Sequence, residues 1–199
     1  GRGEVGEVLA GLDAARAAGF PPPKLNCVVM RGINDAGVLD LVARFRSTGH
    51  VLRFIEYMDV GTCNGWDVTR VVPSAELVAR IHARWPLRPL GRVRASEVAE
   101  RYAFTDGAGE VGFISSVSAP FCGDCSRARL AADGRLYTCL FARDGFDLRA
   151  PLRSGLGDTD LAALIAACWS QRDDRYSERR AELRAPRAVE RVEMFAIGG

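Results

Sequence analysis

The first sixty residues alternate between helical and strand-like patterns of apolar positions. Residues 4–18 repeat apolar side chains at helical spacing, and residues 24–30 follow as a largely apolar run typical of a buried parallel strand. A second helical pattern starts at residues 34–35, where an asparagine or an aspartate can supply the cap, and residues 51–56 predict a second strand. Helix, strand, helix, strand is the order of a parallel sheet or of a (β/α) barrel. The first helical stripe consists of Val5, Val8, Leu9, Leu12 and Ala15.

Beyond residue 60 the pattern becomes that of an α+β unit. Strand-like runs are separated there by turn residues, Asp106-Gly107 in one hairpin and Asp133-Gly134 in another. Residues 172–191 mix arginines with acidic residues and predict a solvated helix and tail. The elements predicted before that segment are a helix over residues 74–85, hairpins over residues 102–114 and 128–140, and a helix over residues 160–171.

These patterns predict an α/β protein in two parts, divided at residue 60. Residues 1–60 would form a βα unit of a parallel sheet or of a (β/α) barrel, and residues 61–199 would form a separate α+β unit. Two parallel strands cannot close a barrel, and they leave exposed sheet edges. We therefore expect that a partner completes the sheet or that the chain lacks its beginning.

Composition excludes several classes of protein. The 27 basic and 25 acidic residues give a net charge of +2, so no strong basic surface indicates nucleic acid or an anionic membrane as a partner. No apolar stretch reaches the roughly 18 residues of a membrane span, and the first residues lack the pattern of a signal peptide. Six cysteines without a secretory signal favour a reducing, cytoplasmic environment, in which thiols bind metal or pack in a core.

The sharpest chemical feature is a group of three cysteines. Cys122 and Cys125 form a Cys-x-x-Cys pair in which Gly123 permits a tight turn, and a hairpin can bring Cys139 back beside them. Three thiolates suit an iron–sulfur cluster with one open iron position, whereas structural zinc takes four protein ligands and no fourth is evident. From the residues alone both metals remain open, and a redox-active disulfide pair is a third alternative.

Two arginines follow the cysteine pair directly. In an extended segment Arg127 and Arg129 project to the same face, beside the candidate metal. Paired guanidinium groups bind phosphate oxygens in a bidentate manner. The alternative is that both are ordinary surface residues of an arginine-rich chain, in which Lys24 is the only lysine. We interpret the pair as a candidate phosphate site.

Several separated motifs resemble those of one known family. They are KLN at residues 24–26, RFIEYM at 53–58, NGW at 64–66, FCGDCSRAR at 121–129, GRLYTCLF at 134–141 and the terminal Gly198-Gly199. Together, and in this order over nearly the whole chain, they resemble the molybdenum cofactor biosynthesis protein A family. Members of that family are GTP 3′,8-cyclases of the radical S-adenosylmethionine (radical SAM) type.

The resemblance implies the chemistry of that family. One 4Fe–4S cluster cleaves S-adenosylmethionine to a 5′-deoxyadenosyl radical, which abstracts a hydrogen atom from the ribose of GTP. The nucleotide then rearranges to 3′,8-cyclo-7,8-dihydro-GTP, an intermediate towards molybdopterin. A second, substrate-side 4Fe–4S cluster binds the guanine through its open iron. By this resemblance its ligands here are Cys122, Cys125 and Cys139. The family also implies a homodimer and a cytoplasmic lyase.

Further site residues follow from the same resemblance. Met58 matches a position that contacts S-adenosylmethionine, although it can also be read as a core methionine. Arg53 matches a position that faces the triphosphate. The Gly198-Gly199 end resembles a tail that enters the active site. The residues that would bind GTP are Lys24, Arg127, Ala128 and Arg129.

The sequence departs from the family in one large respect. It contains no Cys-x-x-x-Cys-x-x-Cys motif for the radical-generating cluster. We therefore expect a C-terminal fragment, or one half of a split protein, that is inactive alone. Residues 1–60 would be the end of a radical SAM barrel, and residues 61–199 would be the iron–sulfur, GTP-binding domain.

Three other functions remain open from the sequence. The chain could carry the auxiliary cluster of a different radical SAM protein. It could be a zinc-binding interaction module in which Cys63 completes a tetrahedral site. It could also be a carrier that is activated at its Gly-Gly end, although such carriers are small β-grasp folds.

Overall fold

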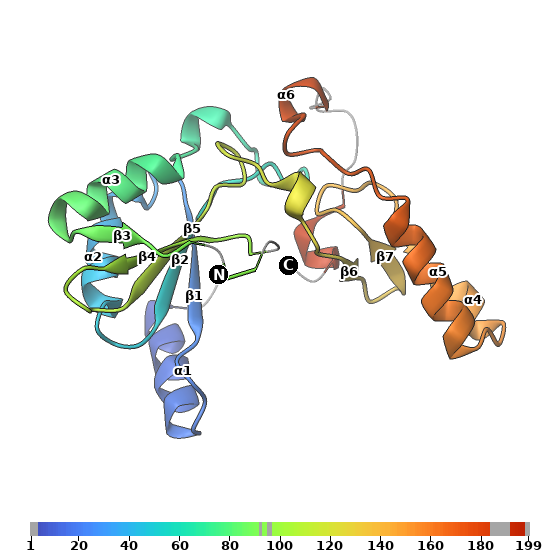
Figure 1. The fold of residues 1–199 in the computed structure, drawn as a ribbon, viewed down its shortest axis with the longest axis horizontal. Coiled ribbons are helices and arrows are strands. Elements are labelled where there is room, and N and C mark those ends of the chain that lie inside the picture. Colours follow the sequence, from blue (N-terminus) through green and yellow to red (C-terminus); the bar gives the residue numbers. More distant parts are fainter. Residues whose placement is uncertain (1–3, 92, 95–96, 184–191, 198–199) are drawn as a thin grey trace. The chain divides into compact units, whose positions relative to one another are not determined.

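The computed structural model describes residues 4–91, 93–94, 97–183 and 192–197. The chain forms two compact units, one of residues 1–57 and 69–118 and the other of residues 58–68 and 119–199 (Figure 1). This division differs from the expected boundary at residue 60. The reason is that the predicted hairpin at residues 102–114 pairs with the second predicted strand and so joins the first unit.

The first unit contains a five-stranded mixed sheet. Its strands, in spatial order, are β1 (Lys24–Val29), β2 (Val51–Glu56), β5 (Glu110–Ile114), β4 (Glu100–Phe104) and β3 (Leu87–Pro89). The pairs β1–β2 and β2–β5 are parallel, whereas β5–β4 and β4–β3 are antiparallel. The α/β class is thereby confirmed, but the expectation of only two paired parallel strands is wrong. Within the described residues the sheet is open, with β1 and β3 at its edges.

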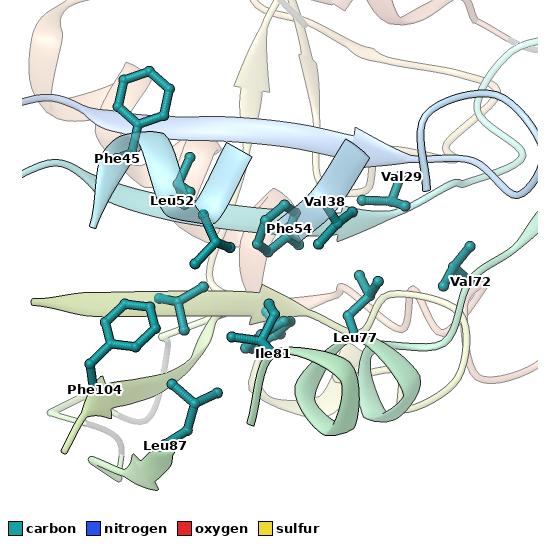
Figure 2. Close-up of a cluster of buried hydrophobic side chains, with 13 residues drawn as sticks. Val29, Val38, Phe45, Leu52, Phe54, Val72, Leu77, Ile81, Leu87 and Phe104 are labelled. Carbon is teal, nitrogen blue, oxygen red and sulfur yellow. The ribbon is translucent and has the colours of Figure 1, made fainter. Parts of the chain in front are cut away.

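One face of this sheet carries the main hydrophobic core. Every second residue of β2 is buried, and these side chains pack against α2 (Val38–Phe45) and α3 (Ser74–Arg84). Figure 2 shows side chains from the strands and both helices meeting in this cluster. The fully buried members include Val29, Phe54, Phe113, Val42, Leu77 and Ile81. The period-two burial of the strand leaves its alternate residues free to line the opposite face.

The buried carboxylate of Glu56 ties three parts of the first unit together. It is only 1% exposed, at the end of β2. It accepts hydrogen bonds from the backbone N–H groups of Ser74 (2.8 Å), Val117 (2.8 Å) and Ser118 (2.7 Å), and from the Ser118 hydroxyl. Since Ser74 is the first residue of α3, one side chain joins a strand, a helix start and the segment after β5.

Two sequence predictions for the first unit need correction. Asn34 and Asp35 make no capping hydrogen bond to α2, because a 3-10 turn η1 (Asp35–Gly37) intervenes and both side chains brace the turn after β1. The helix α1 (Val5–Ala17) is confirmed, but Val5 and Val8 are 75% and 59% exposed. Only Leu9 and Leu12 of its apolar stripe pack against the core.

The second unit is built on a small antiparallel sheet of three strands. Its hairpin turns at Gly134, whose φ of +84° lies in the left-handed region that favours glycine. Its buried cluster is Ala131, Tyr137 and Ile197, so the segment near the end of the chain packs onto the hairpin. The strands are β6 (Arg129–Leu130), β7 (Arg135–Tyr137) and β8 (Phe146–Asp147), in that order. The helices are η3 (Cys122–Asp124), α4 (Arg149–Arg153), α5 (Asp158–Ser170), α6 (Arg180–Leu183) and η4 (Met194–Ile197), while η2 (Val68–Arg70) spans the change between the units.

None of the helices in the described part of the chain combines the length and the apolar character that crossing a membrane requires.

Candidate functional site

The three predicted cysteine ligands lie on two neighbouring segments of the second unit. Cys122 begins the η3 turn, and the N–H of Cys125 closes that turn by donating to the Cys122 carbonyl at 3.2 Å. The β6–β7 hairpin follows, and Cys139 lies just after β7. All three thiols are free and half-buried. The predicted hairpin between the Cys-x-x-Cys turn and Cys139 is therefore present.

Electrostatic interactions connect Cys122 with Cys139 directly and Cys125 with Cys139 only through Arg129, and the three thiols do not form a closed ligand set. A charge on Cys122 acts on Cys139, and charges on Cys125 and Cys139 both act on Arg129. Within the described ranges, no three His, Cys, Asp or Glu side chains are already arranged to hold a metal ion. The donor set nevertheless fits an iron–sulfur cluster, because thiolate sulfur is the usual protein ligand of such clusters.

Local charges shift the pKa values of two thiols in opposite directions. Burial acts to raise the pKa of Cys125, but hydrogen bonds from the Arg127 backbone and guanidinium, with the charges of Arg127 and Arg172, outweigh burial and lower this pKa. Burial raises the pKa of Cys139, and the charges of Asp174 and Cys122 add to that effect. Cys125 therefore reaches the thiolate form, the form that binds metal, at a lower pH than Cys139.

The two predicted phosphate-binding arginines are neighbours at the start of β6. Arg127 Nε donates to Cys125 Sγ at 3.3 Å, and its guanidinium lies over the Phe121 ring, 5.3 Å from the centroid. Burial and the charge of Arg127 lower the pKa of Arg129, which shows that the two cations repel each other. Two such cations held together favour an anion between them. Ala128 lies between them in sequence and lines a mainly apolar pocket of about 420 Å³ beside α5.

Residues 172–191 were predicted to form a solvated helix and tail, but their described part, residues 172–183, includes a buried arginine. Arg180 is 8% exposed and forms an ion pair with Asp59, with Nε and Oδ1 2.8 Å apart. Tyr176 donates its hydroxyl hydrogen to Asp59 Oδ2 at 2.6 Å. The Tyr176 ring also stacks on Phe141, with centroids 4.4 Å apart. No periodicity in the sequence distinguishes these buried residues from their exposed neighbours, since arginines and acids alternate throughout the segment.

Lys24 and Arg53 lie in the first unit, on the face of the sheet opposite the core. Both line a pocket of about 600 Å³. Arg53 Nε donates to Asn26 Oδ1 at 2.9 Å, across the β1–β2 register. Gly112 is next to Arg53 in the register, and a Cβ there would lie 3.2 Å from Arg53 Cγ. The missing side chain at Gly112 lets Arg53 extend along the sheet.

The other predicted site residues lie apart from the three cysteines in sequence or outside the described residues. Met58 directly follows Tyr57 after β2, and its carbonyl accepts a hydrogen bond from Asn64 Nδ2 at 3.1 Å. Gly198 and Gly199 lie outside the described residues. Cys63, the fourth ligand of the zinc alternative, donates to Glu193 Oε2 at 3.0 Å. The described structure thus gives Cys63 a carboxylate partner and does not group it with the three cysteines.

Comparison with known proteins identifies close relatives along the whole chain. The family model described as Molybdenum Cofactor Synthesis C matches residues 50–178. The GTP 3′,8-cyclase of Xanthomonas axonopodis pv. citri (strain 306) is 60% identical over 198 residues, covering 100% of this chain and 58% of the relative. That of Acidothermus cellulolyticus is 54% identical over 181 residues, covering 87% and 49%. That of Synechococcus sp. (strain WH7803) is 48% identical over 199 residues, covering 98% and 56%. The chain spans about half the length of these curated relatives.

Proposed function

Because the chain belongs to the molybdenum cofactor synthesis C family, we propose that it is the part of a GTP 3′,8-cyclase that holds the substrate-side cluster and binds GTP. The relatives that it matches over its whole length carry that activity in their names. The activity of the whole enzyme, conversion of GTP to 3′,8-cyclo-7,8-dihydro-GTP in molybdenum cofactor biosynthesis, is part of the same proposal.

The residues that would hold the cluster are Cys122, Cys125 and Cys139. Their support is the β6–β7 hairpin that separates the turn from Cys139, the free state of all three thiols and the electrostatic interaction of Cys122 with Cys139. When bound, a 4Fe–4S cluster with three cysteine ligands offers one iron with an open coordination position for a substrate atom. The protein's own contribution is to fix the three sulfurs and to surround them with cations.

One observation carries the GTP proposal: Arg127 donates to Cys125 Sγ and is a neighbour of Arg129. A guanidinium has five N–H donors, so Arg127 retains donors for phosphate oxygens after bonding to sulfur. An anionic nucleotide bound there would have its charge neutralised directly beside the cluster ligands. Lys24 and Arg53 are proposed from the family resemblance as further contacts for GTP, and Ala128 as a backbone neighbour.

The remaining parts of the proposal come from the fold of the first unit and from the family resemblance. The parallel strands β1, β2 and β5, with helices on one face and polar residues on the other, agree with the last part of a radical SAM barrel. Met58 as a contact for S-adenosylmethionine, a second 4Fe–4S cluster, the Gly198-Gly199 tail and a homodimer rest on the family resemblance alone. All six cysteines are free thiols, which favours the cytoplasm as the working compartment.

The test is metal analysis after anaerobic reconstitution with iron and sulfide. We expect the unaltered protein to bind about four more irons and four more sulfides per chain than the variant with serine at positions 122, 125 and 139. Cys168→Ser, which changes a half-buried cysteine of α5, is the matched control and keeps full loading. Bound zinc without sulfide, or equal loading of the triple variant, would contradict the proposal.

A further inference from the structure

Residues 172–178, here called the strap, contact the Cys-x-x-Cys turn at two points. Arg172 Nη1 donates a hydrogen bond to the Cys125 carbonyl. Glu178 Oε1 accepts the backbone N–H of Gly123 at 3.2 Å, and its carboxylate also pairs with Arg175 at 2.7 Å. Side chains of the strap therefore hold the backbone of the Cys-x-x-Cys turn, and neither of these two hydrogen bonds uses a cysteine sulfur.

The same strap also contacts the segment that carries the third cysteine. Thr138, the residue before Cys139, donates its hydroxyl hydrogen to Asp174 Oδ2 at 2.6 Å. Two residues after Cys139, the Phe141 ring stacks on Tyr176 with an interplanar angle of 24°. The Phe141 N–H in turn donates to Cys139 Sγ at 3.4 Å. Cys139 is thus flanked on both sides by residues that the strap holds.

An ion pair inside the strap joins these two sets of contacts. Arg172 Nε lies 3.4 Å from Asp174 Oδ2, and the Arg172 side chain is only 11% exposed. Within the part of the chain that the structure describes, this buried Nε has no hydrogen-bond acceptor. The Arg172 charge also acts on the thiols of Cys125 and Cys139, so it favours a negatively charged group held by these sulfurs.

We propose that the strap joins the two cysteine segments into one ligand set, with Arg172 and Asp174 as its positioning residues and Arg172 as the cation that stabilises the reduced cluster. This inference rests on the proposed function, because it assumes that the three cysteines hold the cluster. The two segments are separated in sequence by the β6–β7 hairpin, so closing them around a metal costs chain entropy unless another element holds them together. Because the strap already holds both segments before the metal binds, less chain entropy is lost on binding. Residues next to metal ligands orient them and tune the metal, and their loss lowers metal affinity by about 10–100-fold.

The experiment uses the reconstituted protein and four variants. Arg172→Gln removes the charge, Arg172→Lys retains it, and Asp174→Asn weakens the bond to Thr138. Arg179→Gln is the matched control, because Arg179 is 56% exposed and its ion pair is with Glu182, three residues along. Two quantities are measured: the chelator concentration that removes half of the iron, and the midpoint potential of the cluster.

We expect Arg172→Gln and Asp174→Asn to lose half of their iron at a chelator concentration at least about 10-fold lower than the unaltered protein. Arg172→Gln should also shift the midpoint potential to more negative values, because a nearby positive charge stabilises the more negative reduced state. Arg172→Lys keeps the charge but not the guanidinium geometry, so it should restore the midpoint potential more fully than it restores the resistance to chelator. Arg179→Gln should change neither quantity. Circular dichroism of each variant before reconstitution separates these effects from loss of the fold.

The outcomes distinguish this inference from the proposed function. If the unaltered protein takes up no cluster, the proposed function fails and this inference fails with it. If the unaltered protein takes up a cluster and Arg172→Gln matches it in chelator sensitivity and potential, the strap has no such role. That second result leaves the proposed function intact.

Discussion

The guanidinium of Arg127 donates a hydrogen bond from Nε to the sulfur of Cys125, with Nε and Sγ 3.3 Å apart. This contact joins the two chemical features that the proposed function needs, a sulfur that would bind the cluster and a cation that would bind an anionic substrate. It also contributes to lowering the pKa of the Cys125 thiol against the effect of burial. The contact depends on the local backbone, which leaves the η3 turn at Cys125 and enters β6 at Arg129.

Replacing either arginine next to the cysteine pair should weaken GTP binding. Arg127→Ala and Arg129→Ala each remove charge-assisted hydrogen bonds of about 1.5–3 kcal/mol, which corresponds to roughly 10–100-fold in affinity. Lysine at either position should recover only part of the loss, because it cannot bind phosphate in a bidentate manner. Equilibrium titration of the reconstituted protein with GTP measures the effect. Arg153→Ala, in the exposed last turn of α4, is the control, and equal affinities of Arg127→Ala and this control would refute the assignment.

Glu56 should be among the most sensitive positions of the first unit. Glu56→Ala leaves the N–H groups of Ser74, Val117 and Ser118 without their buried acceptor. We expect a loss of at least about 3 kcal/mol in the free energy of unfolding. Glu56→Gln keeps one acceptor oxygen but adds a donor facing these donors, and should cost about 1–3 kcal/mol. Urea denaturation followed by circular dichroism tests both values, and a loss below 1 kcal/mol for Glu56→Ala would show that water replaces the carboxylate.

The contribution of Glu193 to stability should disappear in acid. Hydrogen bonds from the Thr62 N–H, the Cys63 thiol and the Thr62 hydroxyl lower the pKa of Glu193 from its usual 4.5 to about 2. Because the pKa is lower in the folded state, the stabilisation is fully present above about pH 4.5 and is lost as the pH falls through about 2. Denaturation of the unaltered protein and of Glu193→Gln between pH 6 and about pH 2 measures this. The difference between the two should shrink steadily with acid, and a constant difference would contradict the mechanism.

Two glycines with positive φ separate backbone strain from crowding. Gly134 (φ +84°) and Gly155 (φ +88°) both lie in the second unit, but a Cβ at Gly134 would lie 2.7 Å from Arg149 Cβ, whereas nothing lies within 4 Å at Gly155. Gly155→Ala should cost about 1 kcal/mol from backbone strain alone. Gly134→Ala should cost about 1–3 kcal/mol more, because the β6–β7 hairpin must also shift. Equal costs in denaturant titrations would mean that Arg149 moves aside freely.

Local signals in the sequence predicted most individual elements. The strands at residues 24–29 and 51–56, the helix at 74–84 and both hairpins follow from periodicity and turn residues within a few positions. The pairing of β2 with β5 was not predictable, because it joins residues more than fifty positions apart and no short-range pattern records it. The division of the chain into two units depends on that pairing.

The site was predictable in part for a similar reason. The cysteines and arginines at 122–129 form a short motif whose chemistry can be read directly from the sequence. Arg172, Asp174 and Arg180 are also charged, but their burial depends on the tertiary partners Cys125, Thr138 and Asp59. A charged residue in an arginine-rich segment is usually solvated, and only the three-dimensional structure shows which of these are not.

The most direct test of the proposed function is the electron paramagnetic resonance spectrum of the reduced, reconstituted protein before and after addition of GTP. We predict a cluster signal that GTP changes and ATP does not, with the change absent in Arg127→Ala at the same GTP concentration. Such a result would mean that the nucleotide binds beside a cluster held by Cys122, Cys125 and Cys139. A cluster spectrum that stays the same at saturating GTP would contradict the claim that this chain brings the nucleotide and the cluster together.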